Sequence, residues 1–311
     1  MSTYLVSGGA GFIGSNIVRV LVSRGETVRI FDDFSTGRQV NLADILTKVE
    51  LVEGDLRSFD VCSGAVQGVD YILHHGAIPS VQRSVDDPLT SNNVNANGTL
   101  NLLIAAREAN VKRLVCASSS SIYGDSPVLP KQEDMAPQPK SPYAVSKLST
   151  EKYCQVFTEL YGLETVALRY FNVFGPYQDP SSEYSAVIPL FIKAMLVGKA
   201  PVVYGDGLQS RDFTYVSNIV EANLLAAATP NVSGQVFNIA CGKSYTLLDL
   251  IEALNKILDV QIQPTFKPPR AGDVKHSLAD ISRAQKHLGY KVGTDFETGL
   301  RQTVEWYRSH K

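Results

Sequence analysis

Short apolar runs alternate with longer stretches of helical periodicity through the first half of this 311-residue chain. The apolar runs have the length of buried strands and are Tyr4–Ser7, Thr27–Phe31, Val49–Glu53, Tyr71–His74 and Arg113–Ala117. The stretches between them, such as Gly14–Arg24 and Leu100–Ala109, have the periodicity of helices. Strands that alternate with helices form a parallel sheet covered on both faces. We therefore predict an α/β fold with a doubly wound parallel sheet.

The pattern changes in the second half, where loops rich in Gly, Pro and Ser follow a further strand at Glu164–Arg169. Helices are expected near Val187–Val197, Asn218–Ala228 and Leu247–Leu258. We predict a Rossmann-like, nucleotide-binding domain over residues 1–175. Residues 176–311 are expected to form a smaller, partly interleaved portion that binds substrate, with some segments returning to the first domain.

Composition and charge exclude several classes of protein. A hydrophobic fraction of 44% and a charged fraction of 19% are ordinary for a globular chain, and a net charge of -2 predicts neither a nucleic-acid nor a membrane partner. Four separated cysteines, with no Cys-x-x-Cys, favour a reduced, cytoplasmic protein. A strand follows Met1 almost at once, so no signal peptide is expected. His74 and His75 lack neighbouring ligands, and we predict no metal site.

A glycine-rich segment, Ser7–Gly14, follows the first expected strand and opens the first helix. Gly8 would allow a tight turn, Gly11 a close approach of the backbone to a pyrophosphate, and Gly14 the packing of helix on strand. The N-terminus of the helix would then face the phosphates. The spacing Gly-x-x-Gly-x-x-Gly in this position predicts a dinucleotide site.

Acidic residues follow the second and third expected strands. Asp32 and Asp33 come eighteen residues or more after Gly14, where a carboxylate binds the ribose diol and repels a 2′-phosphate. This position favours NAD over NADP, and the alternative for either carboxylate is to cap a strand end or a helix. Asp55 and Leu56, after the third strand, are candidates for contact with the adenine.

Tyr143 and Lys147 are four residues apart in Ser-Pro-Tyr-Ala-Val-Ser-Lys, which places them on one face of a helix. A nearby ammonium favours the phenolate form of a tyrosine, whose ordinary pKa is about 10. The pair is therefore a candidate acid/base, and the alternative is an ordinary surface pair on an amphipathic helix. A run of four serines, Ser118–Ser121, lies between this pair and the glycine segment.

Taken in order, these motifs resemble the extended short-chain dehydrogenase/reductase family. The resemblance runs from residue 3 to about residue 308, and within the family the chain is similar to nucleotide-sugar 4-epimerases of the UDP-glucose and UDP-N-acetylglucosamine type. The segments that carry it beyond the serine run and Tyr143 are Arg169–Asn172, Gly175–Pro180, Gly205–Phe213 and Arg270–Ser277. The resemblance implies a bound NAD cofactor and a UDP-sugar substrate.

The resemblance also implies roles for individual residues. Ser119 would be the catalytic hydroxyl, with Ser120 as the alternative, Tyr143 the acid/base, and Lys147 the ligand of the nicotinamide ribose. The implied cofactor contacts are Gly8, Gly11, Phe12, Ile13, Gly14, Asp32, Asp33, Asp55, Leu56, Asn95, Tyr143 and Lys147. The implied substrate contacts are Ser80, Ser119, Ser120, Asn172, Arg211, Arg270, Asp273 and Ser277.

The implied reaction inverts C4 of a UDP-hexose through a 4-keto sugar, with NAD regenerated in each turnover. A UDP-glucuronate 4-epimerase is the enzymatic alternative, although Gln178 and Asp179 stand where it would want a cation. The alternative from another class is a non-catalytic, NAD-binding regulatory protein. The resemblance further implies a homodimer formed through the helix with Tyr143 and Lys147 and the helix at Leu100–Ala109.

Overall fold

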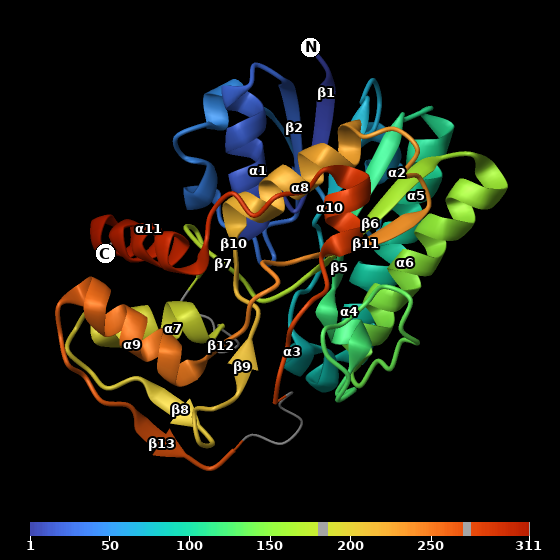
Figure 1. Cartoon of the computed structure of the whole chain (residues 1–311). Coiled ribbons are helices and arrows are strands. Elements are labelled where there is room, and N and C mark those ends of the chain that lie inside the picture. The colour runs from blue at the N-terminus through green and yellow to red at the C-terminus, as the bar shows by residue number, and fades with distance from the viewer. Residues whose placement is uncertain (180–185, 270–274, 311) are drawn as a thin grey trace.

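The computed structural model describes residues 1–179, 186–269 and 275–310. Its main sheet has seven parallel strands in the order β11-β6-β5-β4-β1-β2-β3 (Figure 1). The strands are β1 (Thr3–Ser7), β2 (Thr27–Asp32), β3 (Glu50–Glu53), β4 (Tyr71–His74), β5 (Arg113–Ser119), β6 (Glu164–Tyr170) and β11 (Gln235–Ile239). The prediction of a Rossmann-like, doubly wound sheet is confirmed.

Helices cover both faces of this sheet. Helices α1 (Phe12–Ser23), α8 (Val216–Ala228) and α10 (Ser282–Leu288) lie on one face, and α2 (Phe59–Ala65), α5 (Gly98–Glu108) and α6 (Pro142–Tyr161) lie on the other (Figure 1). Successive strand residues point to opposite faces. Leu5 of β1 thus packs in the core beneath α5 and α6, whereas Val6 packs in the core beneath α1 and α8.

A third core lies beyond the carboxyl ends of the main strands. Phe174, Phe213 and Phe296 meet there among helices α7 (Val187–Met195), α9 (Leu247–Leu258) and α11 (Phe296–Ser309). Three small sheets pair β7 (Val173–Phe174) with β10 (Thr214–Tyr215), β8 (Val202–Tyr204) with β13 (Thr265–Lys267), and β9 (Ser210–Arg211) with β12 (Tyr245–Thr246). Since α8 and β11 join the main sheet before α9 begins, the chain passes between the two regions more than once.

Short helices complete the region under the amino end of α6. They are α3 (Val81–Asp86), α4 (Pro88–Asn92), a π-helical turn η3 (Asn93–Asn97) and the 3₁₀ turn η4 (Ser120–Tyr123). Two further 3₁₀ turns, η1 (Gln39–Leu42) and η2 (Leu46–Lys48), follow β2. Asp87 caps α4, because its carboxylate accepts a hydrogen bond from Thr90 N at 3.0 Å. No helix in the described part of the chain has the length and apolarity needed to cross a bilayer.

Candidate active site

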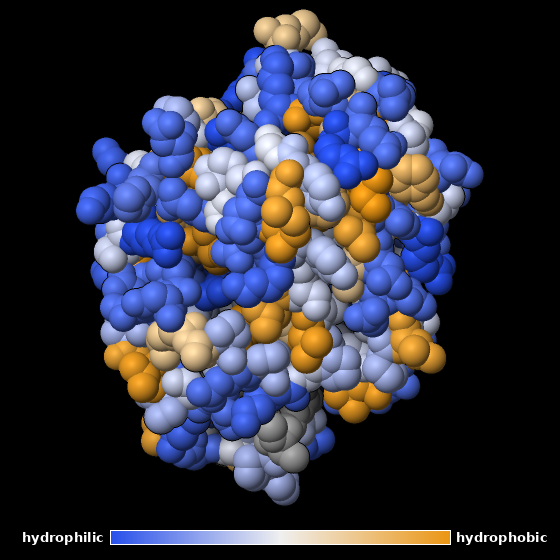
Figure 2. Space-filling model, turned by 90° about the vertical axis from the view of Figure 1, so that its right-hand side faces the viewer, coloured by the Kyte–Doolittle hydropathy of each residue, from blue (hydrophilic) through white to orange (hydrophobic). Residues whose placement is uncertain are grey.

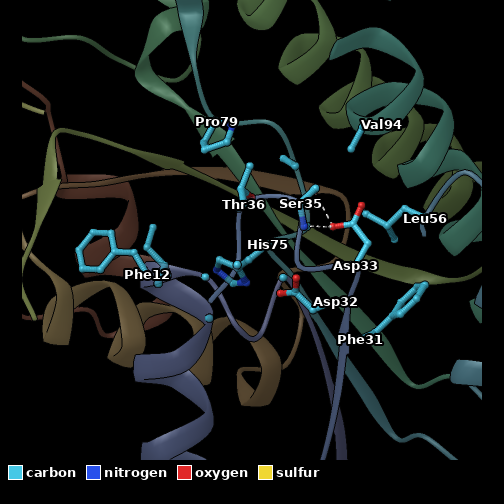
Figure 3. A pocket seen from close by; sticks show the side chains of 18 of the residues that line it. Phe12, Phe31, Asp32, Asp33, Ser35, Thr36, Leu56, His75, Pro79 and Val94 are labelled. Carbon is cyan, nitrogen blue, oxygen red and sulfur yellow. Dashed lines mark hydrogen bonds between the residues drawn. The ribbon is translucent and has the colours of Figure 1, made fainter. Parts of the chain in front are cut away.

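A cavity of about 260 Å³ opens at the carboxyl ends of β1, β2 and β4 (Figure 3). Strand order reverses beside β1, and ligands of open α/β sheets bind at such a switch point. The glycine segment, the residues after β2 and β3, and the first turn of α6 all contribute to its lining. Among the predicted cofactor contacts, the lining includes Gly8, Gly11, Phe12, Ile13, Gly14, Asp32, Asp33, Asp55, Leu56, Tyr143 and Lys147.

The turn between β1 and α1 depends on glycine at two positions. Gly8 has a φ of +68°, and a Cβ at this residue would lie 2.7 Å from the backbone nitrogen of Gly76. A Cβ at Gly14 would lie 2.1 Å from the carbonyl oxygen of Gly8, so the helix packs directly on the turn. In the described chain no side chain caps the helix at Gly11. The free amide groups of its first turn therefore remain available to an anionic ligand.

Two carboxylates project from the end of β2 in different directions (Figure 3). Asp32 is nearly buried, and its oxygens accept hydrogen bonds from Ala10 N and Phe34 N, each at 2.9 Å. Burial raises the pKa of Asp32. Asp33 is exposed and accepts from Ser35, at 2.6 Å from its hydroxyl and 2.9 Å from its amide. Asp32 thus holds the glycine segment and the loop after β2 together while it lines the cavity.

Asp55 and Leu56 line the same cavity from the segment after β3, the strand that pairs with β2. The Arg57 guanidinium hydrogen-bonds the Asp55 carboxylate and lowers the pKa of that group. Asn95 does not contribute to the described lining. Its side chain instead accepts from Ile78 N at 2.8 Å and donates to Ser146 Oγ at 3.1 Å, so it fixes the loop after β4 to α6.

Helix α6 brings Tyr143 and Lys147 to the cavity. The Ser141 hydroxyl accepts from Ala144 N at 3.2 Å, and Pro142 occupies the first helical position, so the sequence starts the helix at this point. Both Tyr143 and Lys147 line the cavity. The Lys147 ammonium is buried and donates to the carbonyl oxygen of Ala117 at 2.9 Å, which ties α6 to the end of β5.

The serine run continues the end of β5 into the turn η4. Ser118 lines the cavity, and its hydroxyl donates to Glu151 at 2.5 Å. The Ser119 hydroxyl accepts from Ser121 N at 3.2 Å. Ser119 and Ser120 are half-buried and are absent from the described linings of both large cavities. The structure therefore brings Ser118 to the first cavity, which its neighbours in the run do not line.

A second cavity, of about 480 Å³, lies between β7, α7, β8 and β9. Asn172 and Arg211 line it together with apolar side chains such as Phe191 and Val202. Asn172 has a φ of +37°, and its side-chain amide donates to Asp212 O at 3.2 Å and to Ser277 Oγ at 3.5 Å. Two of the predicted substrate residues, Asn172 and Arg211, thus line this cavity, and a third, Ser277, contacts Asn172.

Ser80 is absent from the described linings of both cavities. Ser80 is the N-cap of α3, where its hydroxyl accepts from Arg83 N at 3.1 Å. Arg270 and Asp273 fall outside the described residues.

Several lining residues were not predicted from the sequence. Tyr177 and Asp179 reach the first cavity from the segment after β7, and Asp179 forms an ion pair with Arg38 at 3.3 Å. The ring centroids of Tyr177 and Trp306 lie 5.0 Å apart. The guanidinium carbon of Arg19 lies over the Tyr177 ring, 3.9 Å from its centroid. These three partners, Arg19, Arg38 and Trp306, come from three distant segments. The sequence offers one signal, the Gly-Pro pair before Tyr177 that marks a turn.

His74 and His75, at the end of β4, are structural partners of the site. Thr99 donates its hydroxyl to Asn95 O at 2.6 Å, so it must accept from His74 Nε2, which lies 2.8 Å away. His74 Nδ1 then accepts from the Ser7 hydroxyl at 2.6 Å. Burial lowers the pKa of His74 to about 3 and that of His75 to about 4. Both rings are therefore neutral near pH 7.

Comparison with known proteins gives a consistent result over the whole chain. Residues 4–240 match the model of the NAD dependent epimerase/dehydratase family. A UDP-glucose 4-epimerase of Mycolicibacterium smegmatis is 38% identical over 309 residues, covering 98% of each chain. The solved UDP-N-acetylglucosamine 4-epimerase from Methanobrevibacter ruminantium, in complex with UDP-N-acetylmuramic acid, is 43% identical with a TM-score of 0.95, covering 100% of this chain and 99% of that one. A Thermus thermophilus UDP-glucose 4-epimerase, solved with NAD, is 36% identical with a TM-score of 0.90, covering 98% and 99%.

A doubly wound sheet with a glycine turn, an acidic β2 end and a Tyr-x-x-x-Lys helix defines a nucleotide-dependent enzyme of the short-chain dehydrogenase/reductase class. The chain belongs to the NAD dependent epimerase/dehydratase family. The family resemblance predicted from the motifs is thereby confirmed, and so is NAD as the cofactor of the family.

Proposed function

We propose that this protein inverts C4 of a UDP-hexose with a bound NAD. The observation that carries the proposal is that Tyr143 and Lys147 line the same cavity as the glycine turn and Asp32. The uncapped first turn of α1 suits the pyrophosphate, and the carboxylate at the end of β2 suits a ribose diol. When bound, NAD supplies a hydride acceptor that returns the hydride to the sugar.

The side chains of α6 perform the proton transfer in this proposal. Tyr143 takes the proton of the sugar 4-hydroxyl as C4 is oxidised. It returns the proton after the 4-keto sugar has rotated in the site and presents its other face. The Lys147 ammonium, held by the Ala117 carbonyl, provides fixed positive charge beside the phenol. A hydroxyl from the serine run, Ser119 or the alternative Ser120, hydrogen-bonds the reacting oxygen.

The second cavity is the proposed UDP-sugar site. Arg211 offers a guanidinium for the diphosphate, and Asn172 offers a side-chain amide beside it. The implied contacts of Arg270, Asp273 and Ser80 stay part of the proposal. Ser277 is small and adjoins Asn172, which supports a pocket wide enough for a 2-acetamido sugar. We therefore expect UDP-N-acetylglucosamine and UDP-N-acetylgalactosamine to be substrates, and UDP-glucose and UDP-galactose as well.

The test is a panel of UDP-glucose, UDP-N-acetylglucosamine and UDP-glucuronate, each incubated with the purified holoprotein and no added reductant. We expect C4 inversion of the first two. Tyr143→Phe is the matched variant, and its rate should fall by roughly 10²–10⁴-fold. Inversion of UDP-glucuronate alone would favour the enzymatic alternative. Tight NAD binding with no inversion of any sugar would favour the regulatory alternative.

A homodimer is the proposed assembly, formed through α6 and α5. Exposed apolar side chains of α6 support it, with Val145, Tyr153, Val156 and Leu160 spaced along the helix. Figure 2 shows apolar side chains in several clusters on the side of the molecule that carries these helices. A cytoplasmic location stays a prediction from the cysteine pattern.

A further inference from the structure

Glu151 is a buried carboxylate outside the predicted catalytic set. It lies on α6 one turn after Lys147 and two turns after Tyr143, with an exposed fraction of 1%. Its Oε1 accepts from the Ser118 hydroxyl at 2.5 Å and from Arg169 Nε at 2.8 Å. Its Oε2 accepts from Arg169 Nη2, also at 2.8 Å. Three donors from two strands thus converge on one side chain of the catalytic helix.

The two strand partners of Glu151 are themselves neighbours. Ser118 of β5 and Arg169 of β6 are paired in the register of the sheet. Arg169 Nη1 also donates to Tyr123 Oη at 2.8 Å, and that hydroxyl donates to Asn238 Oδ1 at 2.7 Å. The network therefore joins α6 to the ends of β5, β6 and β11 and to the turn η4 that follows the serine run.

Burial of this ion pair is a poor means of gaining stability, because desolvation of two charges offsets much of their attraction. A satisfied buried network does fix geometry, since each donor and acceptor has one good arrangement. The geometry at stake is the end of β5. Ala117 accepts from Lys147, and the next residue, Ser118, donates to Glu151. Two consecutive residues of β5 are thus tied to α6 immediately before Ser119.

We propose that Glu151 is a positioning residue that sets the serine run at a fixed distance from Tyr143 and Lys147. The kinetic part of this inference rests on the proposed epimerase function. A carboxylate is required because a single side chain must accept from both Ser118 and the fork of Arg169. Glutamine in its place has one accepting oxygen and adds an amide that faces the guanidinium.

The chain offers a matched control on the same two strands. Arg113 of β5 and Glu164 of β6 are also register partners, at the other end of the strands, and Arg113 Nε lies 2.8 Å from Glu164 Oε2. Glu164→Gln removes an ion pair between the same strands far from the serine run. Glu151→Gln and Ser118→Ala are the test variants, and Ser118→Ala leaves the Arg169 ion pair in place.

We expect kcat for UDP-hexose inversion to fall roughly 10- to 100-fold in Glu151→Gln, with KM little changed, because misplaced catalytic groups slow the chemical step. Ser118→Ala should lower kcat less. The double variant Glu151→Gln/Ser118→Ala should have a kcat less than about twofold below that of Glu151→Gln alone. The reason is that both substitutions break the same hydrogen bond between Ser118 and Glu151. Glu164→Gln should lower the melting temperature and spare kcat. Two outcomes would overturn the proposal. In one, the fold-losses of kcat in Glu151→Gln and Ser118→Ala multiply in the double variant; in the other, Glu164→Gln loses as much kcat as Glu151→Gln.

Crystal structures of the NAD-bound variants provide a readout that needs no turnover. The distance from Ser119 Oγ to Tyr143 Oη should change in Glu151→Gln and stay as in the wild type in Glu164→Gln. An unmoved serine run in Glu151→Gln would overturn the positioning role, whether or not the protein turns over a UDP-sugar. A wild type that inverts no UDP-hexose would refute the proposed function alone.

Discussion

At the scale of single residues, Asp32 both lines the first cavity, the proposed NAD site, and accepts hydrogen bonds from Ala10 and Phe34. Asp32→Ala should therefore lower the NAD content of the purified protein and relax discrimination against NADP, because it removes the diol acceptor and the repulsion of a 2′-phosphate. Asp33→Ala is the matched comparison, and its loss of NAD should be smaller, since the Asp33 carboxylate faces Ser35. NAD content equal to the wild type in Asp32→Ala would mean that Asp32 only holds the loops together.

The Ser277 hydroxyl lies 3.5 Å from the side-chain amide of Asn172, which lines the second cavity. Ser277→Tyr should abolish activity on UDP-N-acetylglucosamine and UDP-N-acetylgalactosamine and spare UDP-galactose, because the larger ring takes the volume of the acetamido group. Ser277→Ala keeps the volume and should retain activity on both pairs. Rates on each pair decide the matter. Equal slowing of both pairs by the tyrosine would show that Ser277 does not set the width of the pocket.

His74 links acidity to stability. Its folded-state pKa is about 3, below the ordinary value of 6.5, so the unfolded chain binds the extra proton first as the pH falls. The free energy of unfolding should therefore decrease as the pH falls from 6.5 to 3. Above pH 6.5 the contribution of His74 to stability should be fully present. His74→Gln should flatten this part of the profile, as measured by urea midpoints. The comparison variant is His287→Gln, at an exposed histidine on α10.

Residues that local spacing groups together could be selected from the sequence. Gly8, Gly14, Tyr143 and Lys147 all line the first cavity, and their roles in binding and catalysis stay predictions. Glu151 was not found because its partners are 33 and 18 residues away, and their convergence depends on the register of β5 and β6. The catalytic assignment of Ser119 stays a prediction, as do the roles given to the other site residues.

At the scale of elements, α9 begins with a reciprocal capping box. Thr246 Oγ1 accepts from Asp249 N at 3.0 Å, and the Asp249 carboxylate accepts from Thr246 N at 2.8 Å. Thr246→Ala should lower the free energy of unfolding by about 1 kcal/mol. Ser58→Ala is the control, since Ser58 is the N-cap of α2 and its side chain makes no capping bond. Equal losses in chemical denaturation of the two variants would contradict the role of the box.

Six of the seven described strands of the main sheet, β1 to β6, were predicted closely, because burial on both faces makes them continuous apolar runs. The edge strand β11 (Gln235–Ile239) was not predicted. The strand predicted at Arg113–Ala117 corresponds to β5 (Arg113–Ser119). It is longer than predicted by two polar residues, Ser118 and Ser119, at the end that reaches the site. The two-residue strands β7, β9, β10 and β12 were not predicted, because each exists through a pairing between distant segments rather than through its own composition. The division at residue 175 likewise stays a prediction, since the chain passes between the two regions repeatedly.

At the scale of the whole molecule, the proposed homodimer would be built on α6 and α5. Leu160 is 70% exposed and Val145 is 47% exposed, although both are apolar and on the helix that carries Tyr143. Partly buried Leu100 and Ile104 of α5 lie beside the same face. In a two-fold dimer the same surface of both subunits forms the interface, so each contact between two residues occurs twice. The dimer would thus support the catalytic helix from outside, while β5 and β6 support it from inside.

This assembly is testable by one substitution. The wild type should elute with about twice its chain mass of 33.9 kDa, because a stable interface buries roughly 800 Å² per partner and these helices provide an apolar face. Leu160→Glu should elute as a monomer, since the two-fold axis places two uncompensated carboxylates at one interface. Val197→Glu, on an exposed apolar residue after α7, is the control and should remain dimeric. A wild type that is monomeric at micromolar concentration, or a Leu160→Glu variant that stays dimeric, would contradict the α6 interface.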